Sequence, residues 1–273
     1  MKRRFIMKKT LLATLIAATL STTAFAGDTV TINQDAANTA SSAIVTQTDT
    51  DTTQAGASSS ATINQLAGNG SAAVINQLDT DGAIATMTQS GDGEQASINQ
   101  TNVSGATTAE TTQSGSNNLA SIAQSTGSDL SASIIQTGSD DKASVIQTES
   151  NGVSATIAQD GSANDSNVIQ NLATGSSVNI GVVGDTNITN MIQENSTNDN
   201  ATLDIAGSGN TVNARQGSID YASADNTLNY ASLGADNTTT VDQFGIGNTT
   251  TIAQNGTGGS IAVCQGSSAA CGL

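Results

Sequence analysis

The side chains that could carry chemistry in this sequence are carboxylates, side-chain amides and two cysteines. The 273 residues include 23 Asp+Glu and 7 Lys+Arg but no histidine. Nucleophilic and acid–base catalysis both need a base held beside the reacting group, and histidine is the commonest one. Beyond residue 26 the basic side chains are Lys142 and Arg215, so no nucleophile–base pair can be drawn. We therefore predict that the protein is not an enzyme and has no catalytic, cofactor-binding or metal-binding residues.

The carboxylates are the remaining catalytic candidates, because paired acids can cleave glycosidic bonds. They lie beside predicted turns, and no insertion between repeats would build a cleft around them. Two interpretations stay open: they are solvated turn residues, or their repulsion delays assembly until after export. On the second interpretation, lowering the pH toward about 4 should speed assembly. The pairs are Asp79 and Asp81, Asp140 and Asp141, and Asp160 and Asp165.

Glutamine has the most regular spacing in the chain. Between Gln113 and Gln216 two interleaved series each recur every 23 residues, with Val182 and Ile205 in two of the places. The repeat unit is therefore 23 residues, split into half-units of 11 and 12. The glutamines assigned to the repeat are Gln54, Gln65, Gln77, Gln89, Gln100, Gln113, Gln124, Gln136, Gln147, Gln159, Gln170, Gln193, Gln216, Gln243, Gln254 and Gln265.

Each glutamine ends a short run of alternating character, such as Ala132-x-Ile134-x-Gln136, followed by turn-forming residues. Alternation with period two predicts a strand with one buried face. Two strands and two turns for each 23 residues predict a coil, and stacked coils predict an all-β solenoid with amyloid-like cross-β geometry. From Asp28 to Gln265 there is room for about ten coils. The chain contains no proline, which suits laddered strands.

Stacking places each inward glutamine directly over another, where its amide can both donate and accept. A second column lies six residues before every second glutamine. Because asparagine tolerates the left-handed conformation, this column could instead be simple turn chemistry. Its members are Asn118, Asp141, Asn164, Asn187 and Asn210, with Asn248 in a later unit.

The chain divides into four predicted segments. Residues 1–26 are a predicted signal peptide, with a basic start, the apolar run LLATLIAATL and the cleavage site Ala24-Phe25-Ala26. Residues 27–53 carry degenerate repeats, 54–265 form the repeat solenoid and 266–273 are a tail. Five of the 7 Lys+Arg leave with the signal peptide, so the mature charge is 2 − 23 = −21. Such a charge disfavours nucleic-acid and anionic-membrane partners, and the short apolar run disfavours membrane insertion.

The two cysteines, Cys264 and Cys271, lie seven residues apart near the end of the sequence. In an exported protein they could close a small disulfide loop that pins the last strand. Cross-linking between molecules is the alternative.

The repeat resembles that of the curlins, the subunits of bacterial curli fibres, which carry S-x5-Q-x4-N-x5-Q. Gln113-x4-Asn118-x5-Gln124 fits the later part of this motif, as do Gln159-x4-Asn164-x5-Gln170 and Gln243-x4-Asn248-x5-Gln254. The leading serine is mostly replaced, by Thr107, Leu130, Val153 and Asp199. The chain also has about twice the repeats and fewer aromatic residues than such a curlin.

This resemblance implies a protein secreted unfolded across the outer membrane of a Gram-negative bacterium. It implies assembly into extracellular, cell-surface amyloid fibres that serve adhesion and the biofilm matrix. The implied partners are further copies of the chain, a second curlin-like subunit and the secretion machinery. The resemblance leaves open whether the chain is a major or a minor subunit.

The residues themselves also favour polymerisation, because uncovered sheet edges tend to pair. Strand-like sequence runs from Thr29–Gln34 to Ile261–Gln265 without a recognisable capping segment. The alternative is a secreted solenoid that stays soluble, such as an adhesin passenger or an ice-binding protein. Ice binding needs a flat Thr-x-Thr array, for which Thr238-x-Thr240 and Thr249-x-Thr251 qualify.

Overall fold

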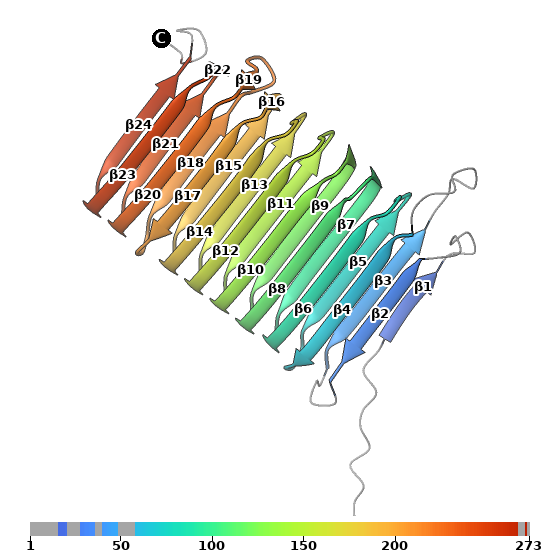
Figure 1. Cartoon of the computed structure of the whole chain (residues 1–273). Helices are drawn as coiled ribbons and strands as arrows, with labels where there is room; N and C mark the ends of the chain where they lie inside the picture. The colour runs from blue at the N-terminus through green and yellow to red at the C-terminus, as the bar shows by residue number, and fades with distance from the viewer. Residues whose placement is uncertain (1–15, 21–27, 36–39, 49–57, 267–270, 272–273) are drawn as a thin grey trace, which may run out of the picture.

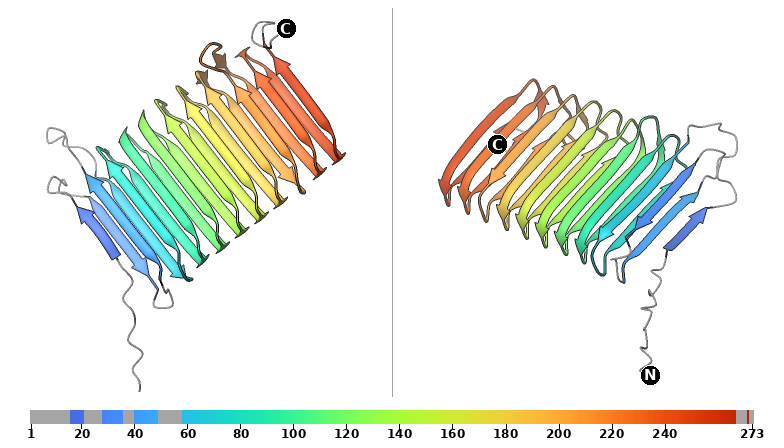
Figure 2. Two further views of the ribbon diagram at one scale, coloured as in Figure 1. Left: turned by 180° about the vertical axis from the view of Figure 1, so that it is seen from behind. Right: turned by 60° about the horizontal axis from the view of Figure 1, so that its bottom comes forward.

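The computed structural model describes residues 16–20, 28–35, 40–48, 58–266 and 271. Over these residues the chain winds into a flattened coil of parallel strands, which stack into a rod (Figure 1). Successive strands alternate between two long sheets, and the two sheets enclose the core between them (Figure 2). The predicted all-β solenoid is confirmed. The described part has no helix long and apolar enough to cross a membrane.

The ten-stranded sheet contains β2 (Thr29–Gln34), β4 (Ser60–Ala67), β6 (Ile84–Asp92), β8 (Thr108–Ser116), β10 (Ser131–Ser139), β12 (Ser154–Ser162), β14 (Ser177–Asp185), β17 (Asn200–Ala206), β20 (Thr227–Ala235) and β23 (Thr249–Thr257). The eleven-stranded sheet contains β1 (Ile16–Leu20), β3 (Ser42–Thr48), β5 (Ala72–Leu78), β7 (Gln95–Ser104), β9 (Leu119–Ser128), β11 (Lys142–Thr148), β13 (Asp165–Asn171), β15 (Ile188–Glu194), β18 (Thr211–Gln216), β21 (Thr238–Gln243) and β24 (Ser260–Gln265). From β2 to β24 the described chain thus makes ten two-strand coils, joined by nine coil-to-coil steps.

The alternating sequence explains the strands. In β10, Ala132, Ile134 and Gln136 are buried, while the residues between them are exposed or half-buried. Burying an isoleucine side chain contributes roughly 1.5–3 kcal/mol, so every coil adds a thin apolar layer to its neighbours. The core is built mostly from Ala, Val and Ile. Two aromatic side chains are buried in the described part: Tyr230 lies within the main apolar cluster, and Phe244 lies outside that cluster.

The irregular spacings of the sequence do not break the pairing. Gln216 is aligned with Gln243 in neighbouring strands although 27 residues separate them. The extra residues form the connection between β18 and β20, which also carries the short strand β19 (Ser223–Ala224). β19 pairs with β16 (Ser196–Thr197) and β22 (Gly245–Ile246) in a small third sheet. Insertions are therefore absorbed in turns, and the inward register continues.

A second, smaller cluster of buried side chains lies under the turns that lead into the ten-stranded sheet. It consists of Ala83, Val103, Leu130, Val153 and Ala173. Leu130 and Val153 occupy the position of the leading serine in the curlin motif. These departures therefore have a packing role, because they fill a small apolar layer in the middle coils.

The solenoid begins before residue 54. β2 and β3 lie in the segment 27–53, and Gln47 of β3 is aligned with Gln77. Gln54 lies outside the described residues. β1 falls within the predicted signal peptide and pairs with β3, with Leu20 opposite Gln47.

Candidate functional site: amide ladders and the two ends of the rod

The inward glutamines of the eleven-stranded sheet form one continuous hydrogen-bonded ladder. Each Nε2 donates to the Oε1 of the glutamine in the next coil toward the C-terminus, at 2.6 to 3.1 Å. The ladder runs through Gln47, Gln77, Gln100, Gln124, Gln147, Gln170, Gln193, Gln216, Gln243 and Gln265. All of its links point in the same direction along the rod.

From Gln77 to Gln265, each glutamine of this ladder also bridges the two sheets. Gln124 Nε2 donates to Gln147 Oε1 at 2.8 Å and to the backbone oxygen of Thr108, in the opposite sheet, at 2.9 Å. Both amide hydrogens are thereby used. The side chain therefore holds the stacking register and the spacing between the sheets at once, which an apolar residue could not do.

The ladder of the ten-stranded sheet is interrupted. It links Gln34, Gln65, Gln89, Gln113, Gln136 and Gln159 at 2.6 to 3.0 Å. Val182 takes the next rung, and Gln159 Nε2 donates instead to Ser166 Oγ at 3.0 Å. Ile205 and Ser232 follow, and Gln254 occupies the last rung.

Gln254 is held differently from the other predicted rungs. Its Oε1 accepts hydrogen bonds from Tyr230 Oη at 3.1 Å and from Thr239 Oγ1 at 2.7 Å. Its Nε2 is buried and has no partner among the described residues.

The asparagine column forms a ladder of its own at the turn before each strand of the eleven-stranded sheet. Asn187 Nδ2 donates to Asn164 Oδ1 at 3.0 Å, and the backbone N–H of Asn187 donates to the same atom at 3.1 Å. Asn187 Nδ2 also donates to the backbone oxygen of Gly207 at 2.8 Å. The left-handed residue is the one before, such as Thr186 with φ 58. Simple turn chemistry therefore does not explain the column.

One asparagine was assigned to the wrong column. Asn248 lies in the other turn, where its backbone N–H donates to Asn226 Oδ1 at 2.7 Å. The first column continues instead from Asn210 to Asn237, whose Nδ2 donates to Asn210 Oδ1 at 3.1 Å. Asn237 lies six residues before Gln243, so the same spacing rule could have found it.

Among the described residues, three carboxyl groups are fully buried in these turns: those of Glu94, Asp141 and Asp199. Desolvation raises the pKa of Glu94 to about 7, against hydrogen bonds from Asn118 that lower it. Desolvation also raises the pKa of Asp141 and of Asp199. Asp141 is therefore not the solvated turn residue that one interpretation of the sequence made it.

The two ends of the rod present different amide atoms. At the N-terminal end, Gln34 Oε1 and Gln47 Oε1 are buried and accept no hydrogen bond among the described residues. At the C-terminal end, Gln254 Nε2 is without a partner, and Gln265 Nε2 donates only to the backbone oxygen of Thr249 at 3.3 Å in the described structure. In the described structure, acceptors without a partner therefore lie at one end, and N–H donors without a partner lie at the other.

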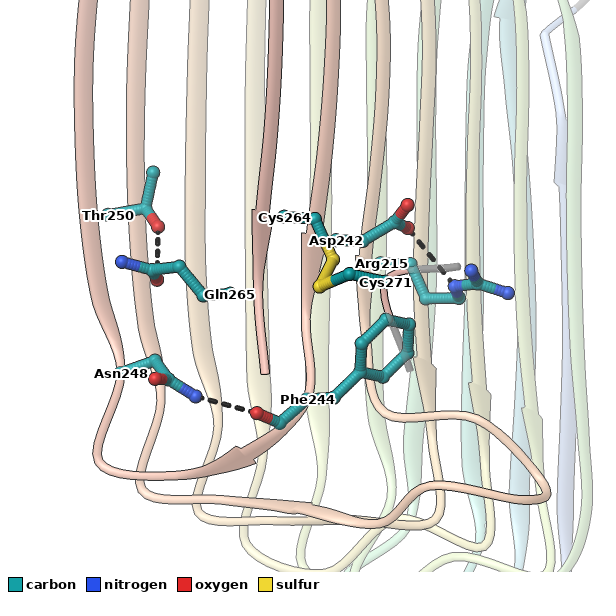
Figure 3. Close-up of a disulfide and its surroundings, with 8 residues drawn as sticks. All are labelled: Arg215, Asp242, Phe244, Asn248, Thr250, Cys264, Gln265 and Cys271. Carbon is teal, nitrogen blue, oxygen red and sulfur yellow. Dashed lines mark hydrogen bonds and ion pairs between the residues drawn. A yellow bond between two sulfur atoms is a disulfide. The ribbon is translucent and has the colours of Figure 1, made fainter. Parts of the chain in front are cut away.

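The last coils of the described rod contain a disulfide and a small polar network (Figure 3). Cys264 and Cys271 are joined, with their Cα atoms 5.8 Å apart. On the outer face nearby, Arg215 pairs with Asp242 at 3.2 Å and lies 5.1 Å from the centre of the Phe244 ring.

The residues considered for ice binding do not form one array. Thr238 and Thr240 lie on β21 in the eleven-stranded sheet, whereas Thr249 and Thr251 lie on β23 in the ten-stranded sheet. In the described part, no group of three His, Cys, Asp or Glu side chains could hold a metal ion.

Comparison with known families identifies a curlin repeat in the chain. The model of the curlin associated repeat matches residues 108–138, which span β8, β9 and most of β10. The match contains the motif copy Gln113, Asn118 and Gln124, and it confirms the resemblance to the curlin family. No curated protein matches the chain.

Proposed function

From the curlin-associated repeat that the chain carries, we propose that the protein is a structural subunit of a curli-like extracellular fibre. Copies add end to end, so that the coils of one molecule continue those of the next. The observation that supports this proposal is that the described structure has acceptors without a partner at one end and N–H donors without a partner at the other. Burying either kind of amide group without a partner costs about 1–3 kcal/mol, so both ends gain by joining.

The amide atoms also give the fibre a direction. When the C-terminal end of one copy meets the N-terminal end of another, Gln254 Nε2 lies over Gln34 Oε1, and Gln265 Nε2 over Gln47 Oε1. Two N-terminal ends would instead bring acceptors against acceptors. We therefore propose head-to-tail stacking.

The strands at the two ends match in register as well as in polarity. β23 reads TTTIAQ from Thr249 and β2 reads TVTINQ, so Ile252 would cover Ile32. β24 reads SIAVCQ and the start of β3 reads SAIVTQ, so Val263 would cover Val45. The new step would resemble the nine steps inside the molecule.

The proposed setting follows the family resemblance. Residues 1–26 would direct export and be removed, which would take β1 away and leave β3 as an edge strand. The mature chain would cross the outer membrane unfolded through dedicated machinery of a Gram-negative bacterium. Together with a second curlin-like subunit it would form surface fibres that serve adhesion and the biofilm matrix.

The test is to incubate the purified chain that starts at Gly27. We expect SDS-resistant fibres that bind thioflavin and give a meridional reflection at ~4.8 Å. A protein that stays monomeric and rich in β-structure would overturn the proposal and favour a soluble solenoid.

A further inference from the structure

Two buried carboxyl groups occupy places in the turn column that other coils give to asparagine or serine. Asp141 lies between Asn118 and Asn164, and Glu94 lies in the coil before Asn118. Both side chains are fully buried. The charge on a buried carboxylate is costly unless a cation or several donors compensate it.

The donors reach one oxygen of the Asp141 carboxyl group and both oxygens of the Glu94 carboxyl group. Asp141 Oδ1 accepts hydrogen bonds from the Asn164 backbone N–H at 2.9 Å and from Asn164 Nδ2 at 3.0 Å. Asp141 Oδ2 is buried and has no partner among the described residues. Glu94 accepts from the Asn118 backbone N–H at 3.2 Å and from Asn118 Nδ2 at 3.3 Å.

The atom that Asp141 leaves unused corresponds to a donor in the asparagine coils. Asn118, Asn164 and Asn187 each donate Nδ2 to a glycine oxygen 20 residues further on, namely Gly138, Gly184 and Gly207. The equivalent acceptor for Asp141 is the backbone oxygen of Gly161, to which no side chain donates in the described structure. A carboxylic acid has one O–H that could fill this role, whereas a carboxylate has none.

The charges around the two groups oppose ionisation. Asp92 and Asp141 act on Glu94, and Asp140 and Asp185 act on Asp141. Lys142 follows Asp141 in the chain, but its side chain is exposed on the outer face of β11. No cation therefore compensates either group in the described part of the molecule.

We propose that Asp141 and Glu94 are protonated in the folded coil and stand in for asparagine, so that closing these coils takes up protons. Asp141 Oδ2–H then donates toward Gly161, as the asparagine amides do in their coils. Mild acidity stabilises these coils, and alkaline conditions open them. This inference concerns the folding of single coils and does not depend on whether copies assemble.

The direction with pH follows from the raised pKa values. An acid whose pKa is higher in the folded than in the unfolded state holds more protons when folded, so stability falls as pH rises between the two values. For Glu94 this window runs from 4.5 to about 7. For Asp141 it begins at 3.8 and extends upward. The opening equilibrium should rise about tenfold per pH unit for each group that titrates.

Hydrogen exchange of single backbone amides tests the proposal on monomer or fibre alike. The backbone N–H of Asn164 donates to Asp141, so its protection should fall by up to about tenfold per pH unit as the pH rises above 3.8, the ordinary pKa of Asp141, after correction for intrinsic exchange. The backbone N–H of Asn210 is an internal control, because it donates its hydrogen bond to an amide oxygen, Asn187 Oδ1, which does not titrate. Equal pH dependence at both amides would overturn the proposal.

Two pairs of substitutions test whether the pH dependence at Asn164 comes from Glu94 and Asp141. The pair Glu94→Gln and Asp141→Asn should flatten the pH dependence at Asn164. The matched pair Glu110→Gln and Asp160→Asn removes the same two types of carboxyl group from exposed sites and should leave the dependence unchanged. Equal flattening by both pairs would contradict the proposal.

The single variant Asp141→Asn guards against a folding failure, since asparagine already fills this position in neighbouring coils. It should fold at pH 5 and gain protection at pH 8 relative to the natural chain. Failure to fold, or unchanged protection, would overturn the assignment. Asp199 provides a further comparison for Asp141 alone, because both oxygens of Asp199 accept hydrogen bonds, from the Asn226 N–H and from Ser223 Oγ, whereas Asp141 Oδ2 has no partner among the described residues.

Discussion

Both glutamine ladders join stacked coils through hydrogen bonds between buried amides, but only one of the two ladders is continuous. In the eleven-stranded sheet every coil from β3 to β24 supplies a glutamine, and the hydrogen bonds continue across the insertion between Gln216 and Gln243. In the ten-stranded sheet the series of hydrogen bonds stops after Gln159, and Val182 and Ile205 occupy the next two positions. Both replacements are buried, so the core accepts an apolar rung.

The difference shows what an interruption requires. Where the ladder stops, Ser166 supplies the hydrogen-bond acceptor that Val182 lacks. The residues aligned with Ser166 in β11 and β9 are alanines, Ala143 and Ala120. The broken ladder therefore has a local repair, whereas the continuous ladder keeps a direct amide–amide bond at every step, and Thr250 adds a second bridge only between Gln243 and Gln265. We infer that the continuous ladder fixes the register of the rod, and that the interrupted one tolerates change near its end.

The largest effect is expected inside the continuous ladder. Gln147→Leu removes the acceptor of Gln124 Nε2 and the donor to Gln170 Oε1, and both atoms stay buried. Two orphaned groups at about 1–3 kcal/mol each should lower the free energy of unfolding by roughly 3 kcal/mol. Urea unfolding followed by circular dichroism measures this loss.

The control for this change is Ser144→Ala on the half-buried outer side of the same strand. It should change the free energy of unfolding by less than about 0.5 kcal/mol. A similar loss in both variants would show that the ladder does not carry the difference.

A smaller effect is expected where the interrupted ladder ends. Gln159→Val orphans the Gln136 amide and the Ser166 hydroxyl, but it gains an apolar contact with Val182. We expect a loss of about 1–2 kcal/mol in the same unfolding measurement. Adding Ser166→Ala should recover part of it, because the hydroxyl is then no longer buried without a partner. Additive losses in the double variant would argue against the repair.

The exposed ends of both ladders should affect assembly. Gln34→Leu and Gln47→Leu each remove an acceptor that the next copy would use, and each should slow seeded fibre elongation about tenfold, equivalent to ~1.4 kcal/mol. Thioflavin fluorescence after seeding gives the rate. Thr31→Val, an outward change on β2, is the control. Elongation at the natural rate in both glutamine variants would contradict head-to-tail docking through these atoms.

Much of this architecture follows from the sequence, because alternation with period two and a strict 23-residue step leave few ways to stack the strands. The inward face of β10, with Ala132, Ile134 and Gln136, can be read directly from that pattern. The pattern is less clear about which stacked column contains Gln243, Asn237 or Asn248. After Gln216 the spacing changes to 27 and then 22 residues, and periodicity does not say which turn absorbs an insertion.

The ends of the ladders and the buried acids need coordinates. Sequence spacing shows that Asp141 shares a column with Asn118, but exposure decides whether its carboxyl group is solvated or enclosed. The direction of the hydrogen bonds between the side-chain amides likewise depends on which atom of Gln47 faces Gln77. Periodicity alone does not identify Gln47 as a member of the ladder, because Gln54 fits the spacing of the later glutamines more closely.

The smallest effect is expected on the outer face at the same two coils that the ladder joins through Gln216 and Gln243. Arg215 and Asp242 form an ion pair there, with side chains 41% and 30% exposed. Asp242→Asn should cost less than about 1 kcal/mol, because solvent screens such pairs and the Arg215 contact with Phe244 remains. Gln243→Leu, one residue away on the inner face, should cost about two to three times more in the same urea titration. If the two losses were equal, pairing across the outer face would hold these coils as strongly as the amides do, and the ladder would lose its special role.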